Sequence, residues 1–256
     1  MICKLCGKDE KLIKAHIIPE SLWPHRKQGG KQIVYSSIHK YYPKRSPKGI
    51  YDTTILCENC EKQFSPWDDY AQSLLLSDIE NNYIVENEKK VCFEIHDYDY
   101  SKLKLFFISL LWRSSVSSHE FFQGVQVNKF ENQLKEMILD NDPGNEDSFS
   151  VILARWDDAA IEEGIGLGIL SPWRRRFSGI NYYSFYFGFG FLATIKVDQR
   201  PVPKPFRRGI LKPNNPLYIY IFQLSQSKEI EHIQKISEAQ KIKDLFCPFQ
   251  VRKRKS

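Results

Sequence analysis

The spacing of apolar residues predicts helices in the first half of the chain. Residues 102–115 carry large apolar side chains every three or four positions, and Ser101 just before them is a suitable N-cap. Similar patterns predict a helix that begins near Asn59, a helical segment over 67–82 and another helix over 127–139. A segment of strand character, 83–96, lies between the helical segments 67–82 and 102–115.

Beyond residue 148 the pattern changes to that of strands. Short segments rich in β-branched and aromatic residues, with turn residues between them, predict an antiparallel sheet covered by the earlier helices. These segments are 149–155, 180–187, 190–196 and 217–222. An amphipathic helix is predicted over 227–243. The fold class predicted from the pattern is therefore α+β.

Length and composition support a globular protein. The chain has 256 residues, 42% of them hydrophobic and 27% charged, which argues against a disordered segment or a coiled coil. The longest apolar run, 103–112, is interrupted by Lys104 and is shorter than the roughly 18 residues of a membrane span. The N-terminus lacks the apolar core of a secretory signal. We therefore expect a cytoplasmic protein without a membrane partner.

Positive charge is concentrated near the N-terminus. The net charge is 37 − 31 = +6, and residues 1–66 alone hold twelve Lys and Arg against six Asp and Glu. Such a segment favours a nucleic acid, with Lys44, Arg45 and Lys48 as candidate phosphate contacts, although a solvated lysine-rich surface has the same composition. Arginine runs at 174–176 and 207–208, expected in loops, are further candidate phosphate contacts.

Four of the six cysteines form two Cys-x-x-Cys pairs. This spacing directs two thiolates at one ion, and two such pairs predict a closed structural zinc site. A disulfide framework is disfavoured by the length and expected compartment of the chain, and a redox pair is disfavoured because no strand precedes the first pair. The predicted zinc ligands are Cys3, Cys6, Cys57 and Cys60. Cys92 and Cys247 are expected to be buried in apolar surroundings.

The residues between and around the two pairs form a further motif. Its parts are Cys3-x-x-Cys6, Ala15-His16-Ile-Ile-Pro19, Asp52 placed five residues before Cys57, and Cys57-x-x-Cys60-Glu61. The motif resembles the HNH endonuclease family, in which a ββα-metal (treble-clef-like) finger is often braced by a four-cysteine zinc. The resemblance covers about residues 1–80, and we accordingly expect a finger at 1–82 and a substrate-recognition or regulatory α+β domain at 83–256.

The resemblance implies an activity and the residues that carry it. His16 would be the general base that activates water, Asp52 would occupy the position of a bracing asparagine, and Glu61 would replace the histidine that ligates a divalent metal. Asp69, or Asp68 beside it, would supply another oxygen if the helix bends at a proline. The implied cofactors are structural Zn²⁺ and catalytic Mg²⁺ or Mn²⁺.

The implied function is metal-dependent endonuclease hydrolysis of nucleic acid, DNA rather than RNA. Prokaryotic proteins with this resemblance often serve host defence or mobile elements, so anti-phage defence is one implied setting. Ala15 stands where the family has a metal ligand and cannot coordinate an ion. The alternative is therefore an inactive zinc module that binds nucleic acid or protein. A regulatory protein partner and a homo-oligomer both stay open.

Overall fold

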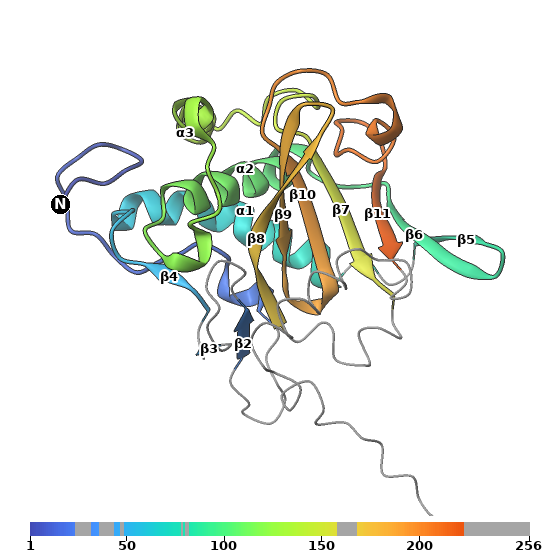
Figure 1. Cartoon of the computed structure of the whole chain (residues 1–256), viewed down its shortest axis with the longest axis horizontal. Coiled ribbons are helices and arrows are strands. Elements are labelled where there is room, and N and C mark those ends of the chain that lie inside the picture. Colours follow the sequence, from blue (N-terminus) through green and yellow to red (C-terminus); the bar gives the residue numbers. More distant parts are fainter. Residues whose placement is uncertain are drawn as a thin grey trace, which may run out of the picture.

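The structure, a computed structural model, describes residues 1–23, 32–35, 44–46, 49–77, 79, 82–157 and 168–222, with the backbone alone at 32–35, 44–46 and 168. It confirms the mixed α+β class, with a large and mostly antiparallel sheet beside a helical layer (Figure 1). None of the helices in these ranges is both long and apolar enough to cross a bilayer.

The large sheet has nine strands in the order β3-β2-β8-β9-β10-β7-β11-β6-β5. Its central strands are apolar on both faces, and most of the β9 side chains are buried. Two neighbouring pairs, β2 with β8 and β7 with β11, are parallel, and the other pairs are antiparallel. The strands are β2 (Gln32–Tyr35), β3 (Lys44–Ser46), β5 (Tyr83–Glu86), β6 (Lys89–Ile95), β7 (Val151–Trp156), β8 (Gly168–Phe177), β9 (Ile180–Tyr186), β10 (Phe191–Lys196) and β11 (Leu217–Phe222).

Three α-helices pack together beside this sheet: α1 (Glu58–Ser77), α2 (Tyr100–Val116) and α3 (Glu131–Leu139). Helix α2 is apolar on nearly every side, which is the pattern of a fully buried helix. The Asp99 side chain caps it by accepting a hydrogen bond from the Lys102 N–H at 3.0 Å. The prediction of Ser101 as N-cap was wrong, because the helix begins at Tyr100, two residues earlier than predicted, and Asp99 occupies the capping position.

Other elements also differ from the prediction in their bounds. The segment 83–96 forms a hairpin rather than one strand, because Asn87 and Glu88 adopt positive φ angles and reverse the chain. The arginine run 174–176 lies within β8, not in a loop. Cys92 is buried in β6 as expected. The predicted helix over 227–243 and Cys247 lie outside the described residues.

A small second sheet precedes α1. Strands β1 (Ala15–His16) and β4 (Tyr51–Asp52) pair antiparallel, with Ala15 opposite Asp52 and His16 opposite Tyr51. The chain between them contributes β2 to the large sheet, and the buried apolar side chains form one cluster that extends from residue 3 to residue 219. The boundary at residue 82 stays a prediction, but the regions on its two sides share this core.

Candidate metal centre and the histidine beside it

The four predicted cysteines converge on one point. The sulfur atoms of Cys3, Cys6, Cys57 and Cys60 all lie within 4.8 Å of one another. All but Cys6 are buried, and Cys6 is half-buried. Four thiolates gathered in this way suit a tetrahedral ion such as zinc. Within the described ranges, no other three His, Cys, Asp or Glu side chains converge to hold a metal.

The backbone explains why these cysteines meet. In the first pair, Gly7 adopts a φ of +74° and donates a hydrogen bond to the Cys3 carbonyl at 2.8 Å, which closes a tight turn. The second pair lies at the start of α1, with Cys57 before the helix and Cys60 in its first turn. The N–H groups of Lys4 and Ile13 donate to carbonyls just before Cys57, and these bonds hold the two turns together.

The polar surroundings of the sulfurs differ. Burial raises the pKa of Cys3, but the N–H groups of Cys6, Cys57 and Leu5 outweigh it and lower that pKa to about 7. Burial raises the pKa values of Cys57 and Cys60, and the neighbouring thiols raise the pKa of Cys60 further. A bound zinc ion would favour the thiolate form at all four positions, because metal-ligating thiols are deprotonated.

His16 lies next to this centre with its backbone held on both sides. Its N–H donates to Oε1 of Glu61 at 3.2 Å, and its carbonyl accepts from Nη1 of Arg113 at 2.9 Å. Its imidazole is half-buried and makes an edge contact with the Tyr51 ring at 6.3 Å between centroids. Lys14, two residues before His16, is exposed. Its Nζ lies 5.1 Å from the centroid of the Tyr51 ring.

Arg113 anchors this arrangement from α2. Its side chain has no exposed surface, and its two terminal nitrogens bind the Asp68 carboxylate at 2.9 and 3.1 Å. Burial raises the pKa of Asp68, while the charge of Arg113 opposes that rise. Asp68 is therefore committed to an ion pair. Arg113 was not among the predicted site residues, although it is the only charged residue between Leu105 and Val116, which was a usable signal.

Glu61 is the acidic side chain best placed for a divalent metal. Burial raises its pKa, and the nearby Arg113 charge and the His16 N–H oppose that effect. Its Oε1 binds the His16 N–H, but Oε2 is buried and has no hydrogen-bond partner among the described residues. A buried carboxylate oxygen without a partner is costly. Oε2 is therefore the one oxygen of this carboxylate that is left to accept a further contact.

Asp52 faces away from His16, since neighbouring positions of paired strands alternate between faces. Its buried carboxylate accepts hydrogen bonds from Thr54, Ser117 and Ser118 at 2.6–3.1 Å. Burial would raise its pKa, but these bonds lower it to about 2. Asp52 thus ties β4 to the residues after α2, which is a positioning role.

Of the other candidate residues that the structure describes, Asp69 is not gathered at His16. Asp69 is exposed and follows Glu61 by eight positions of α1, about 12 Å along an uninterrupted helix. Ala15 is fully buried. Lys44 and Arg45 lie in β3, where only the backbone is described, and Lys48 lies outside the described residues.

Comparison with protein-family models, with curated proteins and with solved structures found no match. The inference about function therefore rests on the geometry of the chain itself.

Proposed function

We propose that this protein is a metal-dependent nuclease that hydrolyses phosphodiester bonds of nucleic acid, with His16 in its active site. The observation that carries the proposal is the double hold on the His16 backbone by Glu61 and Arg113. Burying charged groups is costly. Here the Glu61 and Arg113 side chains both bind the backbone of a histidine that is itself only half-buried. Such positioning is typical of a side chain whose orientation matters for chemistry.

The proposed roles follow from this geometry. The imidazole of His16 accepts the proton of the attacking water. Lys14 lies beside it on the Tyr51 ring and provides positive charge for the substrate phosphate. The four-cysteine centre, with zinc bound, joins the turn before β1 to the start of α1 and so keeps His16 and Glu61 together.

The proposed metal ligand is Glu61 through its unpartnered Oε2. Mg²⁺ or Mn²⁺ bound there would neutralise charge that develops on the phosphate and the leaving oxygen. A single protein carboxylate is compatible with Mg²⁺, which keeps several waters and binds substrate phosphate directly. Asp68 is not proposed as a second ligand, because Arg113 already occupies its oxygens.

The test is a cleavage assay with zinc-loaded protein, supercoiled DNA, single-stranded DNA or RNA, and added Mg²⁺ or Mn²⁺. His16→Ala should lower the rate by about 10²–10⁴ while zinc content stays unchanged. His96→Ala is the matched control, because His96 is exposed at the end of β6, and it should cut normally. Glu61→Gln should lose activity that excess metal restores in part.

Two results would end the nuclease proposal. One is a wild-type protein that cuts none of these substrates with either metal. The other is a His16→Ala protein that cuts as well as the wild type. In either case a zinc module that binds nucleic acid or protein would account better for the buried Ala15 and the ion-paired Asp68.

A further inference from the structure

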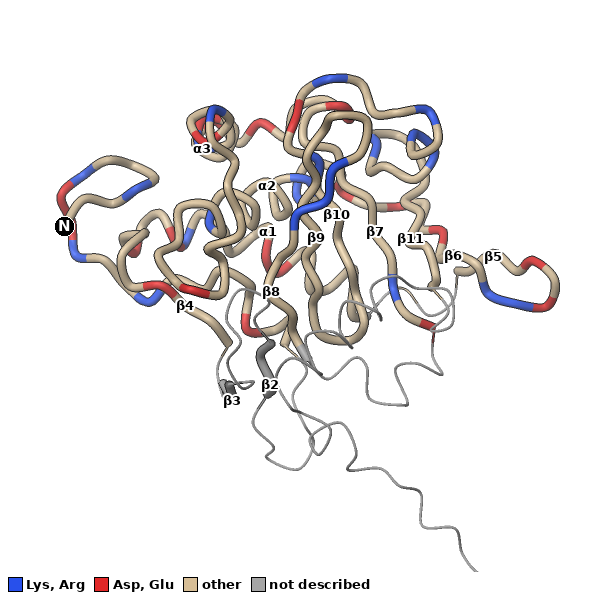
Figure 2. The backbone as a smooth tube through the Cα atoms, in the orientation of Figure 1, with Lys and Arg blue, Asp and Glu red and all other residues tan. Residues whose placement is uncertain are grey.

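The end of strand β8 carries an exposed run of positive charge. Arg174, Arg175 and Arg176 follow one another in the strand, and all three side chains are exposed. Because successive strand residues point to opposite faces, Arg174 and Arg176 lie on one face of β8, and Arg175 and Phe177 lie on the other. At these positions β8 pairs only with β9 among the described residues, so its two faces meet at an open edge. Figure 2 shows it as an unbroken blue stretch along the upper part of this strand.

Aromatic rings lie next to this charge. Phe177, the last residue of β8, is 42% exposed and packs edge-on against Phe206 with 4.8 Å between ring centroids. Phe206 ends a short turn that begins with the exposed Lys204. A second contact joins the same two segments, because Arg200 donates to the carbonyl of Gly179 at 3.4 Å. We call this surface the arginine patch: Arg174, Arg175, Arg176, Phe177, Lys204 and Phe206.

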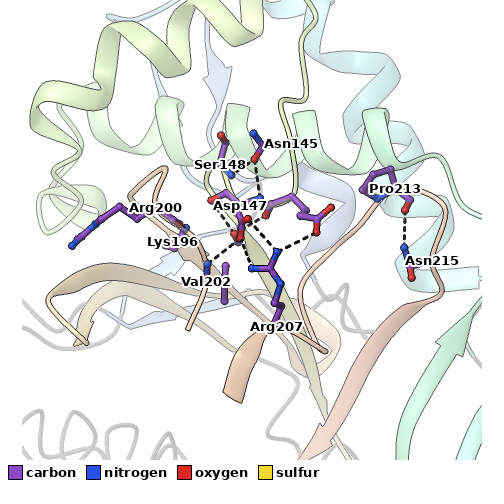
Figure 3. Close-up of polar contacts among 11 residues, drawn as sticks. Asn145, Asp147, Ser148, Lys196, Arg200, Val202, Arg207, Pro213 and Asn215 are labelled. Carbon is purple, nitrogen blue, oxygen red and sulfur yellow. Dashed lines mark hydrogen bonds and ion pairs between the residues drawn. The ribbon is translucent and has the colours of Figure 1, made fainter. Parts of the chain in front are cut away.

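Few acidic groups balance the arginine patch. Residues 173–181 and 199–212 together contain eight Lys and Arg and no Asp or Glu. Nearby acids are bound to two cations outside the patch. Asp198 pairs with Arg200. Asp147 pairs with Arg207, as Figure 3 shows. In the part of the chain that the structure describes, no ion pair involves Arg174, Arg176 or Lys204.

We propose that the arginine patch binds a strand of nucleic acid that crosses the open edge of β8. Its phosphates lie on Arg174, Arg176 and Lys204, and an unpaired base stacks on Phe177, on the opposite face from Arg174 and Arg176. Arginine matches phosphate oxygens with two parallel N–H donors, and its charge is independent of pH. Cations interleaved with exposed aromatic rings are the arrangement by which proteins hold single strands, since every base can stack. The partner is therefore a single strand or an unpaired segment of a duplex.

This binding is separate from the cleavage proposed at His16. The patch is formed by β8 and residues 204–206, whereas His16 lies in β1, and strand binding needs no catalytic metal. The zinc-loaded His16→Ala protein therefore measures the binding without interference from cutting. A failure of cleavage would leave the patch proposal standing, and a failure of binding would leave the cleavage assay interpretable.

The experiment is fluorescence anisotropy with labelled single-stranded and duplex oligonucleotides over a range of salt concentrations. Arg174→Gln/Arg176→Gln should weaken single-strand binding and flatten the plot of log K against log[salt] by about 1.4, or about 0.7 per lost phosphate contact. The control is Lys89→Gln/Lys90→Gln on β6, which removes the same charge from an exposed site. It should leave both quantities nearly unchanged.

Phe177→Ala tests the stacking step. It should weaken single-strand binding at least about fivefold, with little effect on the salt slope and less effect on duplex. Thermal melting of every variant checks that the fold is intact. The proposal is overturned if the arginine variant and the lysine control weaken binding equally, or if folded variants of the patch bind both oligonucleotides as the wild type does.

Discussion

Lys104 is a buried amine whose removal should stabilise the protein. It lies in the second turn of α2 with no exposed surface, and its Nζ donates one hydrogen bond, to the Ser148 carbonyl at 2.8 Å. Burial and, after it, the charge of Lys196 lower its pKa from 10.5 to about 7, although Asp147 and Glu146 oppose the shift. The substitution Lys104→Met keeps the length and apolar part of the side chain and removes the amine.

The magnitude follows from the pKa shift. Lowering the pKa of this lysine from 10.5 to about 7 corresponds to about 5 kcal/mol of lost stability when the amine is charged in both states. At pH 7 the loss is about 4 kcal/mol, because half of the folded molecules are then neutral at this position. The lost hydrogen bond to Ser148 costs about 1 kcal/mol. Lys104→Met should therefore gain about 3 kcal/mol at pH 7.

The sign of the pH dependence is also fixed. Between pH 7 and 10.5 the unfolded chain binds the Lys104 proton and the folded chain releases it, so stability rises with pH. From pH 7 to pH 9 this contribution is about 2 kcal/mol, and it should be missing in Lys104→Met. Urea unfolding of the zinc-loaded proteins at pH 7, 8 and 9, followed by tryptophan fluorescence, measures both quantities.

The control for Lys104 is Lys102→Met on the same helix. Lys102 is exposed and pairs with Asp99, so its loss should change stability by less than about 1 kcal/mol at every pH. The reasoning is refuted if Lys104→Met is no more stable than the wild type at pH 7 and shows the same rise toward pH 9.

Further predictions concern the braces around the candidate site. Asp52, with its pKa lowered from 3.8 to about 2, should contribute about 2 kcal/mol above pH 4 that is lost as the pH falls toward 2, and acid unfolding of Asp52→Ala should lack this loss. Arg113→Met leaves Asp68 partly buried without its partner and should cost about 3–5 kcal/mol in urea unfolding, and adding Asp68→Leu should recover part of it. Gly49→Ala places a methyl group at a residue with a φ of +80° and 2.8 Å from the Trp23 ring. It should reduce the free energy of unfolding by about 2 kcal/mol, which a lower melting temperature would reveal. Elemental analysis should find one zinc ion per chain, and its removal by a chelator should unfold the segment before α1.

The local chemistry of the cysteines could be read from the sequence, whereas the partners of charged groups could not. Two Cys-x-x-Cys turns determine where their sulfurs point, so the cluster was predictable from spacing alone. The bonds of Asp52 to Ser117 and Ser118 join residues 65 and 66 positions apart, and those of Arg113 to His16 join residues 97 positions apart. Such contacts depend on how the helices pack, which periodicity does not specify.

The same limit applies to the sheet. Its strands after residue 148 were predicted from their β-branched and aromatic residues. That β2 belongs to the same sheet was not predicted. That strand pairs with β8 across more than 130 positions of the chain, with Ile33 opposite Gly168. The predicted finger therefore contributes a strand to the sheet expected only of the following region.

The place of β11 has a consequence for synthesis of the protein. It is the last described strand in the sequence, yet it lies between β7 and β6, and its pairing joins Leu217 to Ile95. Until the ribosome has released β11, the β5–β6 hairpin has no neighbour in the sheet and β7 has an open edge. Open edges recruit other chains, so a nascent or prematurely ended product that stops before residue 217 should depend on chaperones or be degraded.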